Sequence, residues 1–281
     1  MTPTAPGRTD RRYLMCEPVH YTVSYEINPW MDKTRFTDAD LAVRQWRTLR
    51  DTYLDLGHTV ETIDPIPGLP DMVYAANGAT VLDGVVYSAK FRYAERQPEG
   101  PAYQKWFADR GYVTHTAAET NEGEGDLLVV GDLVLAGTGF RTERSAHAEL
   151  QELFGRPVIS LDLVSPHYYH LDTALAVLSS DPADPQIAYF PPAFSAGSRA
   201  VLQQLFPDAV EATERDAVAL GLNAVSDGYN VVVAPGAVDL AAAIAERGYN
   251  PIPVDTSELL KGGGGAKCCT LEIRPASGSG R

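Results

Sequence analysis

Apolar and polar positions along the chain follow a pattern that repeats several times: a segment of helical period ends at a glycine, and a short apolar run follows at once. Four segments show it, ending at Gly57, Gly111, Gly155 and Gly248. Glycine accepts the left-handed turn that commonly follows a helix, so each segment predicts a helix, its C-terminal turn and then a strand. A further helix is predicted to stop at Phe206-Pro207, because proline cannot continue a helix.

Pairs of apolar runs joined by a tight turn precede most of these helices. Three hairpins are predicted in this way, at residues 80–87, 129–135 and 223–233, with turns such as Asp83-Gly84. Each unit therefore reads strand, strand, helix, strand. About five such units fill the chain, which predicts an α/β fold of radially arranged repeats. An ordinary open α/β sheet is the alternative.

Composition is compatible with one folded domain. The chain has 281 residues, 44% of them hydrophobic and 21% charged, as in ordinary soluble globular proteins. We expect a single domain over residues 13–275, between a flexible N-terminal segment (1–12) and a flexible tail (276–281). Neither a signal peptide nor an apolar stretch long enough to span a bilayer is predicted.

Charge and cysteine usage limit the partners and the compartment. Lys and Arg number 23 against 37 Asp and Glu, a formal charge of −14. Such a field repels phosphate backbones and anionic membranes, so we expect no nucleic acid and no membrane partner, whereas a small cation would be attracted. Three cysteines without metal-ligand spacing, Cys16, Cys268 and Cys269, favour free thiols and a cytoplasmic location.

Two of these thiols directly follow a glycine run. The segment Gly262 to Gly265 precedes Lys267, Cys268 and Cys269. A glycine run lets the backbone approach a ligand closely, and a neighbouring lysine or free amide favours the thiolate, which is the nucleophilic form. The segment lacks the strand, helix and hydroxyl residue of a phosphate-binding loop. It predicts a nucleophile loop; a flexible linker with two buried structural cysteines is the alternative.

A histidine and acid segment at residues 166–173 is a second candidate. Its alternation resembles a strand, which would put His170 and Asp172 on one face and His167 on the other, so we expect no metal site there. Histidine exchanges protons near neutral pH and a carboxylate binds a cation, so the pair suits acid–base chemistry on a cationic substrate. A surface histidine–acid pair is the alternative.

Further charged residues are candidate substrate ligands. Glu122, Glu124 and Asp126 alternate with glycines in residues 121–126 and suit a cation, with a solvated turn as the alternative. Arg96 and Arg141 are candidates for a bidentate contact with a carboxylate, although most arginines are solvated.

Five segments, taken together and in order, resemble the guanidine-modifying pentein superfamily, most closely its arginine dihydrolases. They are INPWM at 27–31, PDMVYAAN at 70–77, EGEGD at 122–126, HLDT at 170–173 and GGGGAKC at 262–268. The superfamily also contains arginine and agmatine deiminases, dimethylargininases and glycine amidinotransferases. The resemblance covers nearly the whole chain. It implies five ββαβ units around a pseudo-fivefold axis, a five-bladed α/β propeller, in agreement with the repeat.

The resemblance also implies roles for individual residues. Cys268 is expected to be the nucleophile, with His170 as general acid and base and Glu122 as a further catalytic residue. Glu122 and Asp172 are expected to hold the substrate guanidinium. The other expected substrate-binding residues are Asn28, Asn77, Arg96, Arg141 and Asp126. Deiminases and dimethylargininases usually carry aspartate where Asn77 stands, which favours the dihydrolase reaction.

The function implied is a cysteine-dependent hydrolase of arginine or an Nω-methylated arginine, acting through a covalent amidino-thioether and giving ornithine or citrulline. A dimethylargininase that releases citrulline and dimethylamine is the nearest alternative. A non-catalytic arginine-binding protein on the same scaffold is an alternative of another class. No cofactor is expected, and assembly into a homo-oligomer stays open.

Overall fold

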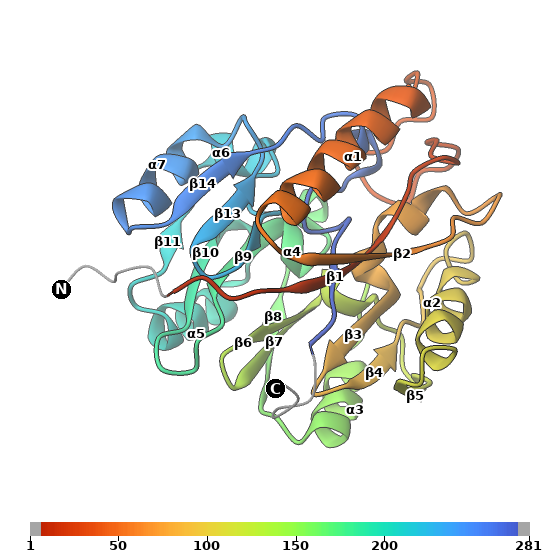
Figure 1. The fold of residues 1–281 in the computed structure, drawn as a ribbon. Coiled ribbons are helices and arrows are strands. Elements are labelled where there is room, and N and C mark those ends of the chain that lie inside the picture. Colours follow the sequence, from red (N-terminus) through yellow and green to blue (C-terminus); the bar gives the residue numbers. More distant parts are fainter. Residues whose placement is uncertain (1–6, 275–281) are drawn as a thin grey trace.

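Five three-stranded sheets make up the fold over residues 7–274, which the computed structural model of the chain describes. Their strands lie toward the middle of the molecule and the long helices lie at its periphery (Figure 1). Four sheets are each built from one continuous stretch of chain, and the fifth combines strands from the two ends of the described chain. The predicted radial α/β repeat is confirmed, and an open sheet is excluded.

The four continuous units share one topology. In each, the first two strands are antiparallel and the third pairs in parallel with the second after the helix. The units are β3 (Ala79–Leu82), β4 (Val85–Ser88), α2 (Glu99–Ala108) and β5 (Val113–His115); β6 (Leu127–Val130), β7 (Leu133–Thr138), α3 (Arg144–Phe154) and β8 (Val158–Asp162); β9 (Leu175–Ser179), β10 (Gln186–Tyr189), α5 (Ala196–Leu205) and β11 (Val210–Glu211); and β12 (Val225–Ser226), β13 (Asn230–Val233), α7 (Val238–Glu246) and β14 (Asn250–Pro253). Two shorter helices are α4 (Leu171–Ala174) and α6 (Glu214–Val218).

The fifth sheet closes the ring. It contains β15 (Leu271–Glu272), β1 (Arg12–Cys16) and β2 (Thr59–Ile63), with α1 (Ala39–Asp55) between the last two. Tyr13 pairs with Glu272 in the antiparallel β15–β1 ladder, and β2 lies parallel to β1. This pairing gives the sheet the same topology as the other four.

Glycines end the predicted helices as expected. Gly57, Gly111, Gly155 and Gly248 have φ of 83°, 80°, 61° and 88°, the left-handed region in which glycine avoids a side-chain clash. Helix α5 ends at Leu205, just ahead of Phe206-Pro207. The interpretation of these segments as helix, turn and strand is confirmed.

The core lies between the helices and the sheets. Strands β3 and β6 are buried along their whole length. In α1 the buried residues Ala42, Trp46, Leu49 and Tyr53 recur at helical spacing and form the face that packs inward. Burying each large apolar side chain contributes about 1.5–3 kcal/mol. None of the helices in the described part of the chain has the length and apolar character needed to span a bilayer.

Part of the N-terminal segment expected to be flexible is held by hydrogen bonds. The amide and hydroxyl of Thr9 both donate to the carbonyl of Asp227, at 2.8 and 2.9 Å. Arg12 already belongs to β1, so the strand begins one residue ahead of the expected domain boundary at residue 13. The expected tail at 276–281 lies outside the described residues.

Candidate active site

The glycine run ahead of Cys268 is tightly packed. Gly263 has φ of 92°, and a Cβ there would lie 2.8 Å from both Asn28 Oδ1 and Tyr169 Oη. A Cβ on Gly264 would lie 2.5 Å from the ring of Tyr74. Because contacts that short do not occur, these positions exclude a side chain. The alternative of a flexible linker is therefore wrong, and the run places Cys268 at a defined position.

The thiol of Cys268 is buried against a carboxylate and an amide. Its Sγ lies 3.2 Å from Asp172 Oδ2, to which it donates, and 3.0 Å from Asn223 Nδ2. Asn223 Oδ1 accepts from the backbone amides of Gly265 and Cys268, both at 3.0 Å. The Nδ2 group also donates to the carbonyl of Asp172 at 3.1 Å. One amide side chain thus fixes both the loop that carries Cys268 and the acid beside it.

The sequence interpretation missed Asn223. It was assigned to the first strand of a hairpin, but β12 begins only at Val225. Asn223 therefore precedes the strand, where its side chain is free to reach the loop of Cys268. A lone asparagine before an apolar run is typical of a turn, so nothing in the local pattern indicated this contact.

His170 and Asp172 reach the site from a helical turn, and the strand expected there is wrong. Residues Pro166–Tyr168 form a single 3-10 turn, and Leu171–Ala174 form α4 with His170 as the residue before its first turn. Thr173 holds this arrangement by donating its hydroxyl to the carbonyl of His170 at 2.7 Å. The exposed fractions of His170 and Asp172 are 1% and 0%, which also excludes a surface pair.

Glu122 joins His170 to Arg141. Its Oε2 lies 2.8 Å from His170 Nε2 and 2.7 Å from Arg141 Nη1. Burial acts to raise the pKa of Glu122, but the Arg141 guanidinium and the His170 hydrogen bond outweigh it and hold that pKa well below its usual range. The carboxylate is therefore ionised and only accepts hydrogen bonds, so Nε2 of His170 carries the proton in this contact. This leaves Nδ1 as the ring atom that can exchange a proton.

The two arginines expected to grip a carboxylate are both buried. Arg141 lies between the rings of Tyr93 and Tyr169, 4.8 and 4.6 Å from their centroids, and also donates to the carbonyl of Ile27 at 3.0 Å. Its remaining contact is with Glu122, so it lies directly beside the His170 cluster.

Arg96 makes more hydrogen bonds within the chain than Arg141 does. It forms a bidentate pair with Glu99 at 3.0 and 2.8 Å and donates to Asn77 Oδ1 at 2.8 Å and to the Asp71 carbonyl at 3.2 Å. These contacts use four of the five N–H groups of a guanidinium. Burial of Glu99 raises its pKa to about 7 despite the opposing charge of Arg96. In this structure Arg96 therefore positions Asn77.

The expected asparagines contact different parts of the site. Asn77 Nδ2 faces the carbonyl of Glu122 at 3.4 Å. Asn28 donates to the carbonyl of Gly262 at 3.0 Å, while its Oδ1 accepts from the amides of Trp30 and Met31. Asn28 thus fastens the loop at residues 27–31 onto the glycine run.

Two buried carboxylate oxygens lack a hydrogen-bond partner among the described residues: Asp172 Oδ1 and Asp126 Oδ2. The other oxygen of Asp126 accepts from the amide of Leu171 at 3.0 Å and so supports the start of α4. Burial raises the pKa of Asp126 to about 6 and that of Asp172 to about 7. Unpaired acceptors of this kind are costly unless a donor meets them, so they mark where a ligand with N–H groups would fit.

Lys267 does not activate the neighbouring thiol, contrary to expectation. Its ammonium donates to Glu124 at 2.6 Å and to the carbonyl of Thr270 at 3.0 Å. Burial, together with the nearby Asp172, raises the pKa of Cys268 well above its ordinary value. In the unliganded site the sulfur is therefore a neutral thiol. No cluster of three or more metal-ligating side chains occurs within residues 7–274.

Comparison with known proteins identifies relatives over nearly the whole chain. The chain is 53% identical over 265 residues to an N(G),N(G)-dimethylarginine dimethylaminohydrolase of Mycobacterium tuberculosis, covering 94% of this chain and 86% of that protein. It is 35% identical to the bifunctional arginine dihydrolase/ornithine cyclodeaminase ArgZ of Synechocystis, of which it spans 38%. No protein-family model matches.

Solved structures agree with these relatives. The N-terminal domain of cyanobacterial ArgZ, in a Cys-to-Ser variant bound to substrate, superposes with a TM-score of 0.88 at 34% identity, covering 95% of this chain and 99% of that domain. A dimethylarginine dimethylaminohydrolase (DDAH) from Pseudomonas aeruginosa complexed with citrulline has a TM-score of 0.77 at 20% identity, over 94% of this chain and 99% of that chain, and shows the shared fold alone. Our chain therefore belongs to the pentein family of dimethylarginine dimethylaminohydrolases and arginine dihydrolases, hydrolases that act on the C–N bonds of linear amidines.

Proposed function

We propose that the chain hydrolyses the guanidino group of free arginine, with Cys268 as the nucleophile. The observation that carries this proposal is the pairing at Asp172: one of its oxygens lies 3.2 Å from Cys268 Sγ, and the other is buried without a partner among the described residues. A guanidinium has N–H groups on every nitrogen and stays charged below a pH of about 12. Bound at Asp172 Oδ1, its central carbon would lie next to the sulfur.

Binding of this cation would prepare the nucleophile. Asp172 is a carboxyl whose pKa burial raises to about 7, and Cys268 is a neutral thiol for the same reason. A positive charge placed beside both groups stabilises their ionised forms, so substrate binding itself favours the thiolate. Oε1 of Glu122, which accepts only a long contact of 3.4 Å from the amide of Arg92, would hold a second edge of the guanidinium.

The reaction then proceeds through a covalent intermediate. As Cys268 ionises, its proton is taken up by His170; the thiolate attacks the central guanidinium carbon and forms a C–S bond, and the C–N bond to the departing nitrogen breaks as His170 gives that nitrogen the proton. His170 next takes a proton from water, whose oxygen attacks the same carbon, and the C–S bond breaks to release citrulline. If citrulline stays bound, the Cys268 thiolate attacks its ureido carbon and a second ammonia leaves, which gives a thiocarbamate. Hydrolysis of the thiocarbamate releases a carbamate, which loses carbon dioxide and yields ornithine.

Recognition of the amino acid end is assigned to Arg141 and Arg96. Arg141 is held beside Glu122 by two tyrosine rings, and Arg96 keeps one N–H group outside its present contacts. Arg96 contacts Asn77, and Arg141 contacts Glu122. If they bind the substrate carboxylate, agmatine, which lacks that group, should be a poor substrate.

Dimethylarginine is a second candidate substrate, favoured by a separate observation. The relative with 53% identity carries the name dimethylarginine dimethylaminohydrolase, whereas the arginine dihydrolase ArgZ is 35% identical. The dihydrolase reaction is favoured by Asn77, at a position where dimethylargininases usually carry aspartate. The two reactions differ in products, since one releases ornithine and ammonia and the other citrulline and dimethylamine.

Product identification tests the proposal directly. The unaltered protein is incubated separately with arginine, dimethylarginine and agmatine, and all small products are identified by mass spectrometry. Ornithine with two equivalents of ammonia from arginine supports the dihydrolase, and citrulline with dimethylamine supports the second candidate. Binding of arginine without turnover would support a non-catalytic binding protein and would overturn the proposal.

A further inference from the structure

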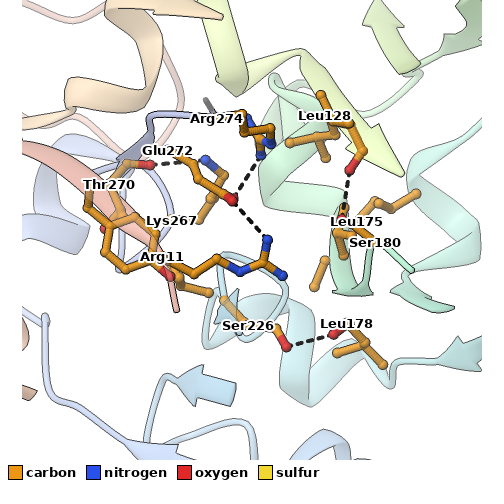
Figure 2. A pocket seen from close by; sticks show the side chains of 16 residues that line it. Arg11, Leu128, Leu175, Leu178, Ser180, Ser226, Lys267, Thr270, Glu272 and Arg274 are labelled. Atoms are coloured by element: carbon orange, nitrogen blue, oxygen red, sulfur yellow. Dashed lines mark hydrogen bonds and ion pairs between the residues drawn. The ribbon is translucent and has the colours of Figure 1, made fainter. Parts of the chain in front are cut away.

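A small polar chamber lies at the centre of the ring, lined by inner strands of four of the five sheets. It has a volume of about 40 Å³, and its walls come from β1, β6, β9, β12 and β15 together with Lys267 and Thr270. We call it the central chamber. Figure 2 shows Arg11, Lys267, Arg274 and Glu272 gathered on one side of it, with Leu128, Leu175 and Leu178 on the other.

Positive charge exceeds negative charge around the central chamber. Three cationic side chains line it, namely Arg11, Lys267 and Arg274, and Glu272 is the anionic side chain among the lining residues. Glu124 adds a second carboxylate, since it pairs with both Lys267 and Arg274. Three positive charges against two negative charges leave one positive charge uncompensated in a partly buried space, where charge imbalance is costly.

The uncompensated donor is on Arg11. Its Nη1 donates to Glu272 at 3.0 Å, but its Nε is buried and has no hydrogen-bond acceptor among the described residues. Ser226 and Ser180, which also line the chamber, use their hydroxyls to donate to the carbonyls of Leu178 and Val129. The walls therefore offer an N–H donor together with a net positive charge.

We propose that the central chamber binds one small monovalent anion, with chloride as the physiological class, through Nε of Arg11. A volume of about 40 Å³ exceeds the ~10–15 Å³ that one water needs, so a monatomic ion fits. A water molecule would satisfy the donor but would leave the charge uncompensated. An anion does both.

This site would stabilise the seam of the ring. Arg11 immediately precedes β1 and contacts Glu272 of β15, so the anion lies where the two end strands pair. A ligand that binds the folded chain and not the unfolded chain raises stability in proportion to the logarithm of its concentration. Chloride should therefore raise the temperature of unfolding without any contact with the substrate.

Thermal unfolding in sodium chloride and in sodium gluconate, at equal ionic strength, tests the proposal on the whole protein. Gluconate is too large for the chamber, so the unaltered protein should unfold roughly 2 °C or more higher in chloride. Arg11→Gln should lose this difference. Arg47→Gln is the matched control, because it removes one positive charge from an exposed pair with Glu17 at 2.8 Å and should keep the difference.

A second measurement does not depend on how the variants fold. Crystals of the unaltered protein grown with bromide in place of chloride should show an anomalous peak within hydrogen-bond distance of Arg11 Nε. Equal unfolding temperatures in the two salts would overturn the proposal, as would a chloride effect that survives Arg11→Gln. Bromide-grown crystals without an anomalous peak in the central chamber would overturn it independently.

Discussion

Glu122 and Glu124 are two residues apart, yet they serve two different regions. Glu122 meets His170 and Arg141 beside the thiol of Cys268. Glu124 pairs with residues that line the central chamber, accepting from Lys267 and Arg274 and from the amide of Glu272. The segment of alternating acids and glycines thus supplies a carboxylate to each side. Lys267 and Cys268 are divided between the same two regions.

The difference between the regions lies in which carboxylates have partners, since the group without a partner beside the central chamber is a donor, Nε of Arg11, and not a carboxylate. Around Glu124 both carboxylate oxygens are paired with cations, so this charge is fully used within the chain. Around Cys268, Asp172 and Asp126 each keep a buried oxygen without a partner among the described residues. Charges that are satisfied hold the fold, whereas acceptors left unsatisfied cost stability, which supports the proposed role of Asp172 in binding a substrate with N–H groups.

Cys268→Ser should give the largest effect. Serine cannot form the thioether, so arginine consumption should fall by at least about a thousandfold while arginine still binds. Ammonia release and calorimetric binding measure the two properties. Cys269→Ala is the matched control, since Cys269 is equally buried but is assigned no role in the reaction, and it should keep activity within a few fold. Turnover of arginine by Cys268→Ser at the rate of the unaltered protein would exclude the covalent mechanism.

Glu122→Gln and Glu124→Gln together test the division between the regions. Glutamine at 122 removes the charge that orients His170, so kcat should fall by roughly 10²–10³-fold, and it breaks the buried pair with Arg141, so the unfolding temperature should fall as well. Glutamine at 124 breaks two buried ion pairs, so the unfolding temperature should fall by several degrees. Steady-state kinetics and thermal unfolding on both variants decide the matter. If both variants lost kcat equally, Glu122 and Glu124 would not serve different regions.

Asp172→Asn should stabilise the protein while abolishing most of its activity. The folded pKa of Asp172, about 7, lies above the unfolded value of about 3.9. The folded state therefore binds more protons than the unfolded state, and stability from this group falls as pH rises between these two values. Asparagine removes that loss, on the order of 4 kcal/mol at pH values above 7.

The advantage of Asp172→Asn should accordingly be larger at pH 8 than at pH 5, as read from urea unfolding at both values. Glu124→Gln, measured in parallel, should show no such gain. An advantage that shrinks with rising pH would mean that Asp172 is ionised and paired in the free protein.

Asn223→Ala tests positioning of the nucleophile. Loss of the amide removes the contacts to Cys268 Sγ, to two backbone amides and to the Asp172 carbonyl, so kcat should fall roughly 10–100-fold with KM nearly constant. Asn250→Ala, at an exposed asparagine that contacts Asn230, is the control and should behave like the parent. A change confined to KM would instead assign Asn223 to substrate binding.

Lys267→Met should give the smallest effect, a shift in pH dependence. Lys267 acts to lower the pKa of Asp172, although burial dominates that pKa. Without the ammonium the pKa rises further, so the acid limb of the kcat/KM profile should move to higher pH, by less than about one unit. Lys267→Arg should restore it, and Lys105→Met, in an exposed pair with Asp109, should leave it unchanged. If the acid limb does not move, the charge of Lys267 does not influence Asp172, and the two regions are electrostatically independent.

Much of the fold was accessible from the sequence because its signals are local. Helices that end at Gly57, Gly111, Gly155 and Gly248, each followed by a strand, are a repeat that the backbone geometry confirms. The pairing that closes the ring could not be predicted from the sequence, since β15 is only two residues long and pairs with β1 from the other end of the chain. Rules that join neighbouring runs into hairpins do not detect such a partner.

The site was only partly accessible. Family motifs pointed to Cys268, and the structure places Asp172 beside it, but alternation around His170 suggested a strand where a short helical turn occurs. Two polar residues spaced two apart fit either geometry, so local pattern cannot separate them. Asn223 carried no motif at all, and its role follows from long-range contacts across the ring.

The seam between β15 and β1 has a consequence for how the enzyme is made on the ribosome. Four sheets can assemble in order as the polypeptide emerges, but β1 waits for its antiparallel neighbour until residue 272 has been translated. Cys268 lies only a few residues before that point. A nascent chain stalled upstream thus lacks both Cys268 and its final strand, so the proposed nucleophile is added at almost the same moment as the strand that closes the ring.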